Sequence, residues 1–243
     1  MIGARIFAAC FRGQMNEAAR LADDLFLRMR TLNRLQFEGE GFVVLAIAGA
    51  LVGRTDLAQA EVGRVHRHNM VVEGTTDELV ALAAALGDAA LARKYVDRAI
   101  QHLRKVALRE TADRSERAIR ALEALAAGRN QQAYDLGISV APKANGDPLE
   151  QLALLVTGLA ALRLEHWDHA TKAFQELSVN RRKLGISPLV GVVHVMLARA
   201  HAGVGRTADA RKAYEEAFTI WQAADRDLPL LLAARREYEK LKT

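Results

Sequence analysis

Six segments of this chain share one short pattern, in which a turn residue is followed five positions later by an alanine. Successive turn residues are separated by 40, 34, 41, 37 and 40 positions. A pattern that returns at such intervals predicts an array of repeated units, each packed on its neighbours. The pairs of turn residue and alanine are Gly13 with Ala18, Gly53 with Ala58, Gly87 with Ala92, Gly128 with Ala133, Glu165 with Ala170, and Gly205 with Ala210.

Each unit is predicted to be a helical hairpin, with a first helix that ends at the turn and a second helix that begins just after it. Alanine suits the point where the two helices cross, because a methyl group lets their backbones approach closely. Small residues seven positions before the turn serve the same contact, and larger residues nine positions after it fill the space beside it. The small residues are Ala46, Ala121, Gly158 and Ala198, and the larger ones are Val62, Val96, Phe174 and Tyr214.

The composition favours helices and gives the chain a mildly basic character. Only four prolines and 5% aromatic residues occur, and long runs are rich in Ala, Leu, Arg and Glu, which are good helix formers. The 34 Lys and Arg residues exceed the 29 Asp and Glu residues, for a net charge of +5. This excess permits acidic protein or nucleic-acid partners, but it is smaller than the concentrated basic face of a dedicated nucleic-acid-binding protein.

Cysteine usage and the longest apolar runs indicate the compartment. Cys10 is the only cysteine, which excludes an internal disulfide and fits a reducing environment. The most apolar runs, 42–52 and 152–162, are about half of the roughly 20 residues that a membrane-spanning helix needs. We therefore expect a cytoplasmic protein with no membrane partner.

The repeats predict one continuous domain over residues 1–243. The strongest loop signal, at residues 142–148, contains two prolines, an asparagine and a glycine, and could separate sub-blocks 1–142 and 147–243. The last predicted helix begins near Pro229 and ends near Leu241. Its charged residues are those of a solvent-facing capping helix, and they are Arg235, Arg236, Glu237, Glu239 and Lys240.

The combination of small residue, turn, alanine and aromatic residue resembles the tetratricopeptide repeat, most closely in residues 205–218, GRTADARKAYEEAF. This resemblance implies an all-α, right-handed superhelical array of about six helix-turn-helix repeats with a C-terminal capping helix. Proteins of this class present an extended concave surface to a partner.

Residues 150–243 resemble a narrower group, through the segment ARAHA at 198–202, Trp221, ADRDLPLL at 224–231 and the pair Glu237-Tyr238. They are similar to the C-terminal tail of bacterial eukaryotic-like serine/threonine protein kinases, and such tails also follow winged-helix domains in some bacterial regulators. The resemblance implies a regulatory or partner-binding role. The sequence has no glycine-rich loop followed by a strand lysine, no His-Arg-Asp loop and no Asp-Phe-Gly motif, so we expect no kinase activity. Because the chain opens within a helical pattern at Ile2, we expect it to be the C-terminal region of a longer protein.

The tetratricopeptide resemblance places a partner groove on the first helix of each hairpin, at positions three, six and ten before the turn. In the last two repeats these positions are mostly apolar and would suit an amphipathic helix or extended peptide. Arg199, the one charged residue among them, could pair with a carboxylate of that partner. Packing between neighbouring helices would equally explain an apolar first helix. The predicted groove residues are Leu155, Leu159, Leu162, Val195, Arg199 and Ala202.

A row of basic residues follows helical spacing in repeats three and four. It could bind phosphates or an acidic partner, which makes a nucleic-acid-binding regulator the alternative function, although a solvated outer face explains the row equally well. The residues are Arg98, His102, Lys105, Arg109, Arg114, Arg117 and Arg120.

His166 and His169 have the spacing of two ligands on one helix face, beside Glu165. Polar residues are also common at a repeat turn, and no further ligands are visible, so we expect no metal and no cofactor. A metal-dependent hydrolase would need carboxylates and histidines that converge, whereas the repeats scatter them. The sequence therefore predicts a protein without catalytic residues, which acts as an interaction or scaffold module for a protein or peptide in a bacterial signalling protein.

Overall fold

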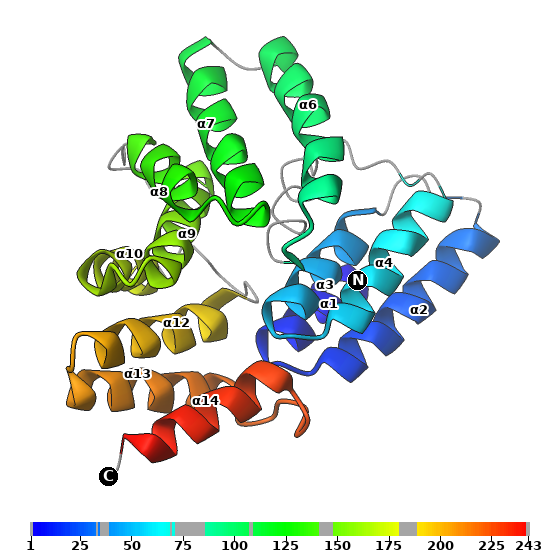
Figure 1. Ribbon diagram of the computed structural model, residues 1–243. Helices are drawn as coiled ribbons and strands as arrows, with labels where there is room; N and C mark the ends of the chain where they lie inside the picture. The colour runs from blue at the N-terminus through cyan, green and yellow to red at the C-terminus, as the bar shows by residue number, and fades with distance from the viewer. Residues whose placement is uncertain are drawn as a thin grey trace.

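The computed structural model describes residues 2–32, 34, 39–68, 70, 86–106, 109–140, 148–179 and 189–241 (Figure 1). These residues form helices and no strand, which confirms the predicted all-helical fold. In this part of the chain the helices are α1 (Ile2–Phe11), α2 (Met15–Thr31), α3 (Gly39–Leu51), α4 (Thr55–Arg67), α6 (Ala89–Val106), α7 (Arg109–Ala126), α8 (Asn130–Ser139), α9 (Pro148–Arg163), α10 (Trp167–Val179), α12 (Leu189–Gly203), α13 (Thr207–Ile220) and α14 (Pro229–Lys240).

The helices pack in consecutive pairs, and neighbouring pairs pack on each other. The pairs are α1 with α2, α3 with α4, α7 with α8, α9 with α10, and α12 with α13. The first helix predicted for repeat three lies outside the described residues, as does most of the predicted loop at 142–148. One cluster of buried apolar side chains extends through the pairs, from Ile6 in α1 to Ala234 in α14.

All six predicted turn residues adopt the left-handed backbone conformation, with φ between 59° and 86°. Five of them are glycines, which adopt this conformation without steric cost, and Glu165 is the only non-glycine residue of this kind in the described part. At the last turn, the amide of Gly205 donates to the carbonyl of Ala202 at 3.0 Å and the amide of Arg206 to that of His201 at 2.9 Å. The same two bonds close the turns at Gly13, Gly53, Gly128 and Glu165, as in a Schellman motif.

The alanine five residues after each turn lies in the first turn of the second helix. All six alanines are fully buried. Each of their amides makes the first helical hydrogen bond after the turn, as Ala210 does to the carbonyl of Arg206 at 2.9 Å. The first helix also approaches the second closely: in the pair α9 and α10, a Cβ atom on Gly158 would lie only 2.7 Å from the ring of Phe174. The predicted close helix pairs are therefore confirmed.

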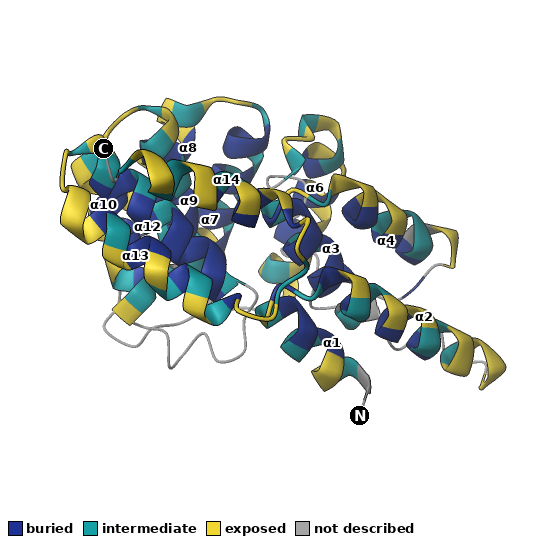
Figure 2. Ribbon diagram, turned by 90° about the horizontal axis from the view of Figure 1, so that it is seen from below, coloured by how far each residue is buried: buried dark blue, intermediate teal, exposed yellow. Residues whose placement is uncertain are grey.

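The two helices of a hairpin differ in how far they are enclosed. Ten of the 15 residues of α12 are buried, whereas only four of the 14 residues of its partner α13 are. Figure 2 shows the same contrast more widely, with buried positions on the sides where helices face each other and exposed positions on the outside. The first helix of this hairpin is therefore the more enclosed of the two.

The row of helices bends round until its last helices lie beside its first (Figure 1). The segment between α13 and α14 contacts the turn between α1 and α2, where the amide of Asp225 donates to the carbonyl of Gly13 at 3.1 Å. The start of α14 contacts the turn between α3 and α4, where the amide of Leu230 donates to the carbonyl of Val52 at 3.1 Å. We call this contact, between residues 221–230 and the first two turns, the closure seam.

The closure seam depends on two turn glycines and buried apolar side chains. A Cβ atom on Gly13 would lie 2.8 Å from Ala224 and 3.2 Å from Trp221, and one on Gly53 would lie 2.9 Å from Pro229. Sequence periodicity predicts an array that grows only by stacking, so closure between the ends is an additional feature. It arises because these two turns carry no side chain that would hold residues 221–230 away.

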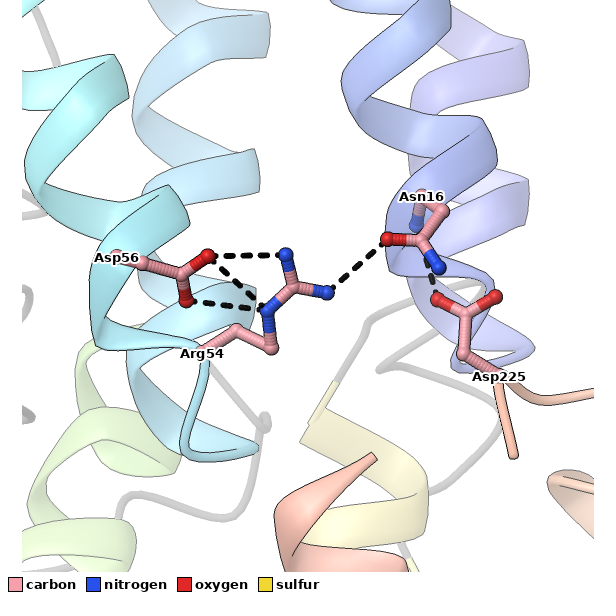
Figure 3. Close-up of polar contacts among 4 residues, drawn as sticks. All are labelled: Asn16, Arg54, Asp56 and Asp225. Carbon is pink, nitrogen blue, oxygen red and sulfur yellow. Dashed lines mark hydrogen bonds and ion pairs between the residues drawn. The ribbon is translucent and has the colours of Figure 1, made fainter. Parts of the chain in front are cut away.

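A polar network covers the edge of the closure seam (Figure 3). Arg54 donates to both carboxylate oxygens of Asp56, and its Nη1 atom donates to Oδ1 of Asn16 at 3.1 Å. The backbone amide of Asn16, at the start of α2, donates to Oδ2 of Asp225 at 2.9 Å. An aspartate from the C-terminal segment thus stabilises the positive end of a helix near the N-terminus.

The predicted capping helix is present as α14, and its exposure differs from the prediction at one charged residue. Arg235, Arg236, Glu239 and Lys240 are exposed, but Glu237 is half-buried and bound to another helix. The prediction that Glu237 faces solvent was wrong, because α14 packs with one side against the array.

Candidate interaction groove

A groove of about 690 Å³ lies between α9, α12 and α14, and the first residue of α10 and one residue of α13 complete its walls. It is lined by four of the six residues predicted to bind a partner. Its lining residues are Leu159, Leu162, Arg163, Trp167, Met196, Arg199, Ala202, Gly203, Tyr214, Glu237, Lys240 and Leu241.

The six predicted groove residues divide according to their position before the turn. Those three and six positions before it line the groove, and they are Leu162, Leu159, Ala202 and Arg199. Those ten positions before it are enclosed by packing, since Leu155 is 7% exposed and Val195 is 0% exposed. The groove is therefore limited to the last two turns of α9 and α12.

The arginine in the groove, Arg199, is already paired with a carboxylate of the chain itself, that of Glu237. Arg199 donates from Nε and Nη2 to the two carboxylate oxygens of Glu237, both at 2.9 Å. The hydroxyl of Tyr214 donates to Oε2 of the same carboxylate at 2.6 Å. Burial by itself would raise the pKa of Glu237, but the hydrogen bonds from Arg199 and Tyr214 outweigh it and lower the pKa. The carboxylate expected from a partner is thus supplied here by the chain's own α14.

Apolar and aromatic side chains form the rest of the walls. Trp167 packs directly on α12 because position 203 is glycine, where a Cβ atom would lie 2.3 Å from the indole ring. Arg163 closes the opposite edge, and its Nη1 atom donates to the carbonyl of Leu125 at 3.0 Å. Burial lowers the pKa of Arg163.

The lining defines what the groove can bind. Three cations, Arg163, Arg199 and Lys240, stand against one carboxylate, Glu237, around an otherwise apolar surface. Such a surface suits a ligand with apolar side chains and an acidic group, because the apolar part is removed from water and the excess positive charge attracts the acid.

The predicted basic row is split between two helices with different surroundings. Arg98, His102 and Lys105 are exposed on α6. On α7, Arg114 is buried, Arg117 is half-buried, and Arg120 forms ion pairs with Glu116 and Glu123. The side chain of Arg109 lies outside the described residues. Among the described side chains of the row, those on α6 are exposed, whereas those on α7 are buried, half-buried or ion-paired.

The two histidines at the turn, His166 and His169, contact the ring of Tyr134, which belongs to the preceding hairpin. The hydroxyl of Tyr134 and Nδ1 of His169 are 2.5 Å apart, and their rings are stacked with centroids 5.6 Å apart. The ring of His166 meets that of His169 edge to face at 6.0 Å. Among the described residues, no group of three or more His, Cys, Asp or Glu side chains converges as a metal site would require.

Sequence reasoning missed the part of the groove that other helices contribute. Trp167, Met196 and Tyr214 lie off the positions from which the groove was predicted, and Glu237 and Leu241 belong to a helix expected to face solvent. The regular repeat indicates the contribution of the first helices alone. A usable signal was present at Gly203, whose lack of a side chain leaves space for Trp167.

Comparisons with known proteins add no relative, because no family model, no curated protein and no solved structure matches the chain. A search of the described residues finds no helix that is both long enough and apolar enough to cross a membrane. The described residues form an all-helical fold of repeated hairpins, with a groove between the last two repeats and the final helix.

Proposed function

We propose that this chain is a non-catalytic protein interaction module of the tetratricopeptide type. In this proposal it is a right-handed superhelical array of about six hairpins, closed by α14, within a cytoplasmic bacterial signalling protein of the kinase or transcriptional-regulator kind. Its groove binds an apolar and acidic segment of a partner protein.

The observation that carries the proposal is the groove of about 690 Å³ with an apolar lining and three cations. Apolar anchors in a shaped pocket supply most of the binding free energy of a peptide, and a charged group at the rim fixes its orientation. The recurrent turn geometry and the six buried alanines support the repeat class, because each hairpin repeats the same local contact. The sequence resemblance of residues 150–243 supports the signalling context.

The test compares two substitutions in a peptide-binding experiment. Peptides of 16 residues are selected by phage display on the wild-type protein, and their affinities are measured for Leu162→Asp and Val179→Asp. Leu162 lines the groove, whereas Val179 is 82% exposed at the end of α10 and lies outside it. We expect Leu162→Asp to weaken binding about tenfold or more and Val179→Asp to leave it unchanged. Equal affinity of both variants, with helicity intact by circular dichroism, would contradict the groove as the binding site.

A further inference from the structure

The final helix contacts two separate functional regions of the molecule with its two ends. Its first residues belong to the closure seam, and its last residues form a wall of the groove. Between these ends, Leu231 and Ala234 are buried against the array. The helix is therefore held along its length rather than at one point.

The N-terminal end of α14 rests on the turn between α3 and α4. Pro229 lies so close to Gly53 that an added Cβ atom would be 2.9 Å from its ring, and the amide of Leu230 donates to Val52. The preceding Leu228 is fully buried. Any change in the position of this turn therefore presses directly on the start of the helix.

The C-terminal end of α14 carries the carboxylate that neutralises Arg199. Both oxygens of Glu237 are bonded to the guanidinium, and Tyr214 adds a third hydrogen bond. Tyr238, the next residue, donates to Oε1 of Glu215 on α13 at 2.6 Å. A partner carboxylate that binds Arg199 must therefore compete with Glu237, and its success would release this end of the helix.

A helix of 12 residues is about 18 Å long and moves as a unit, because its backbone hydrogen bonds resist bending. We propose that α14 couples the interaction groove to the closure seam, so that a change at either one alters the other. When α14 is docked, Glu237 holds Arg199 and Pro229 rests on Gly53. When it is displaced, both contacts loosen together and Arg199 becomes available to a ligand.

This inference rests on the proposed function for the identity of the groove, and it adds regulation of that groove. Contact of another molecule with the turn between α3 and α4 would change groove affinity, and groove occupancy would change the seam by the same coupling free energy. The physical element that both sites bias is one helix with two positions, as an allosteric mechanism requires.

The chain contains two tryptophans, and one lies at each end of the proposed coupling. Trp167 lines the groove, and Trp221 is buried in the closure seam. Incorporation of 5-fluorotryptophan gives one ¹⁹F NMR resonance for each, assigned with Trp167→Phe and Trp221→Phe. The readout needs no ligand, so it is independent of whether the proposed function is correct.

The experiment perturbs each end and observes the other. Gly53→Ala pushes on Pro229, and its control Gly87→Ala places the same methyl group in a turn with φ of 68°, where no described residue lies within 4 Å. Glu237→Gln removes the charge at Arg199, and its control Arg236→Gln removes a charge at an exposed position of the same helix.

We expect Gly53→Ala to shift the Trp167 resonance and Glu237→Gln to shift the Trp221 resonance, each by more than its control does. The proposal is overturned if each substitution shifts only the tryptophan at its own end. The Glu237→Gln comparison decides the question by itself if Gly53→Ala does not fold.

Discussion

At the scale of a single residue, Glu165 is the turn position where the backbone is strained. Its φ of 59° lies in the region that glycine occupies at the other five turns, and its side chain is exposed. A residue with a Cβ atom costs roughly 1 kcal/mol more than glycine in this conformation. We expect Glu165→Gly to raise the free energy of unfolding by about 0.5 to 1 kcal/mol, measured by urea denaturation.

The equivalent turn one repeat later is the control for this prediction. Gly205 has φ of 75°, and an added Cβ atom would meet none of the described residues within 4 Å. Gly205→Ala should therefore lower stability by a similar amount, because it introduces the strain that Glu165→Gly removes. A stabilising effect of Gly205→Ala, or none of Glu165→Gly, would contradict the assignment of the strain to the backbone.

Glu61 is a buried carboxylate that makes stability depend on pH. It is 2% exposed, its Oε2 atom is 3.4 Å from Nε of Arg64, and burial raises its pKa to about 7. A carboxyl group with a raised pKa in the folded state stabilises the protein below its ordinary pKa of about 4.5, and this contribution is lost as pH rises through 7.

Because the pKa of Glu61 is raised, its ionisation destabilises the folded protein at higher pH. Glu61→Gln removes the ionisable group, so the stability of the variant relative to wild type should increase between pH 5 and pH 8, by at most about 3 kcal/mol. Thermal unfolding at several pH values measures the difference. Gln59→Ala, at an exposed position of the same helix that carries no ionisable group, should show a difference that does not change over this range. A pH-independent effect of Glu61→Gln would show that its carboxyl group titrates normally.

At the scale of the helix pair, the alanine after each turn limits how closely the two helices approach. Ala210 is fully buried, whereas Ala208, two residues earlier in the same helix, is exposed. Ala210→Leu would force the helices apart and should lower the free energy of unfolding by about 1 to 3 kcal/mol. Ala208→Leu should change it by less than about 0.5 kcal/mol, as surface substitutions usually do. Equal effects in chemical denaturation would contradict the close helix contact.

The hairpins could be predicted from the sequence because their signals are local. The bonds that end the first helix at Gly205 are followed directly by the bond from the Ala210 amide to Arg206 that starts the second helix, so the spacing of Gly205 and Ala210 is fixed by backbone geometry. The groove could be predicted only in part. Leu159 and Arg199 lie on a repeated face, but the wall that contains Glu237 depends on how a later helix docks, which no local pattern determines.

At the scale of the whole molecule, closure makes the ends of the array depend on each other. Terminal units of an open array have a neighbour on one side only and unfold locally before the centre does. Here the first hairpin gains a second neighbour through the closure seam, where Asp225 binds Gly13 and Asn16 across more than 200 positions of sequence. Contacts at this separation cannot be derived from repeat spacing, which explains why the sequence analysis predicted only contacts between neighbouring repeats.

The seam predicts how amide hydrogen exchange responds to a single methyl group. Gly13 and Gly128 have φ of 72° and 71°, so alanine strains both turns equally, but only at Gly13 would the methyl group meet Ala224, Trp221 and Leu228. We expect Gly13→Ala to accelerate exchange of the Asn16 and Leu230 amides about tenfold or more beyond the effect of Gly128→Ala, because both amides bond across the seam. Mass spectrometry of exchanged fragments measures this. If both variants exchange alike, the terminal hairpins are stable without closure, and the array behaves as an open stack in solution.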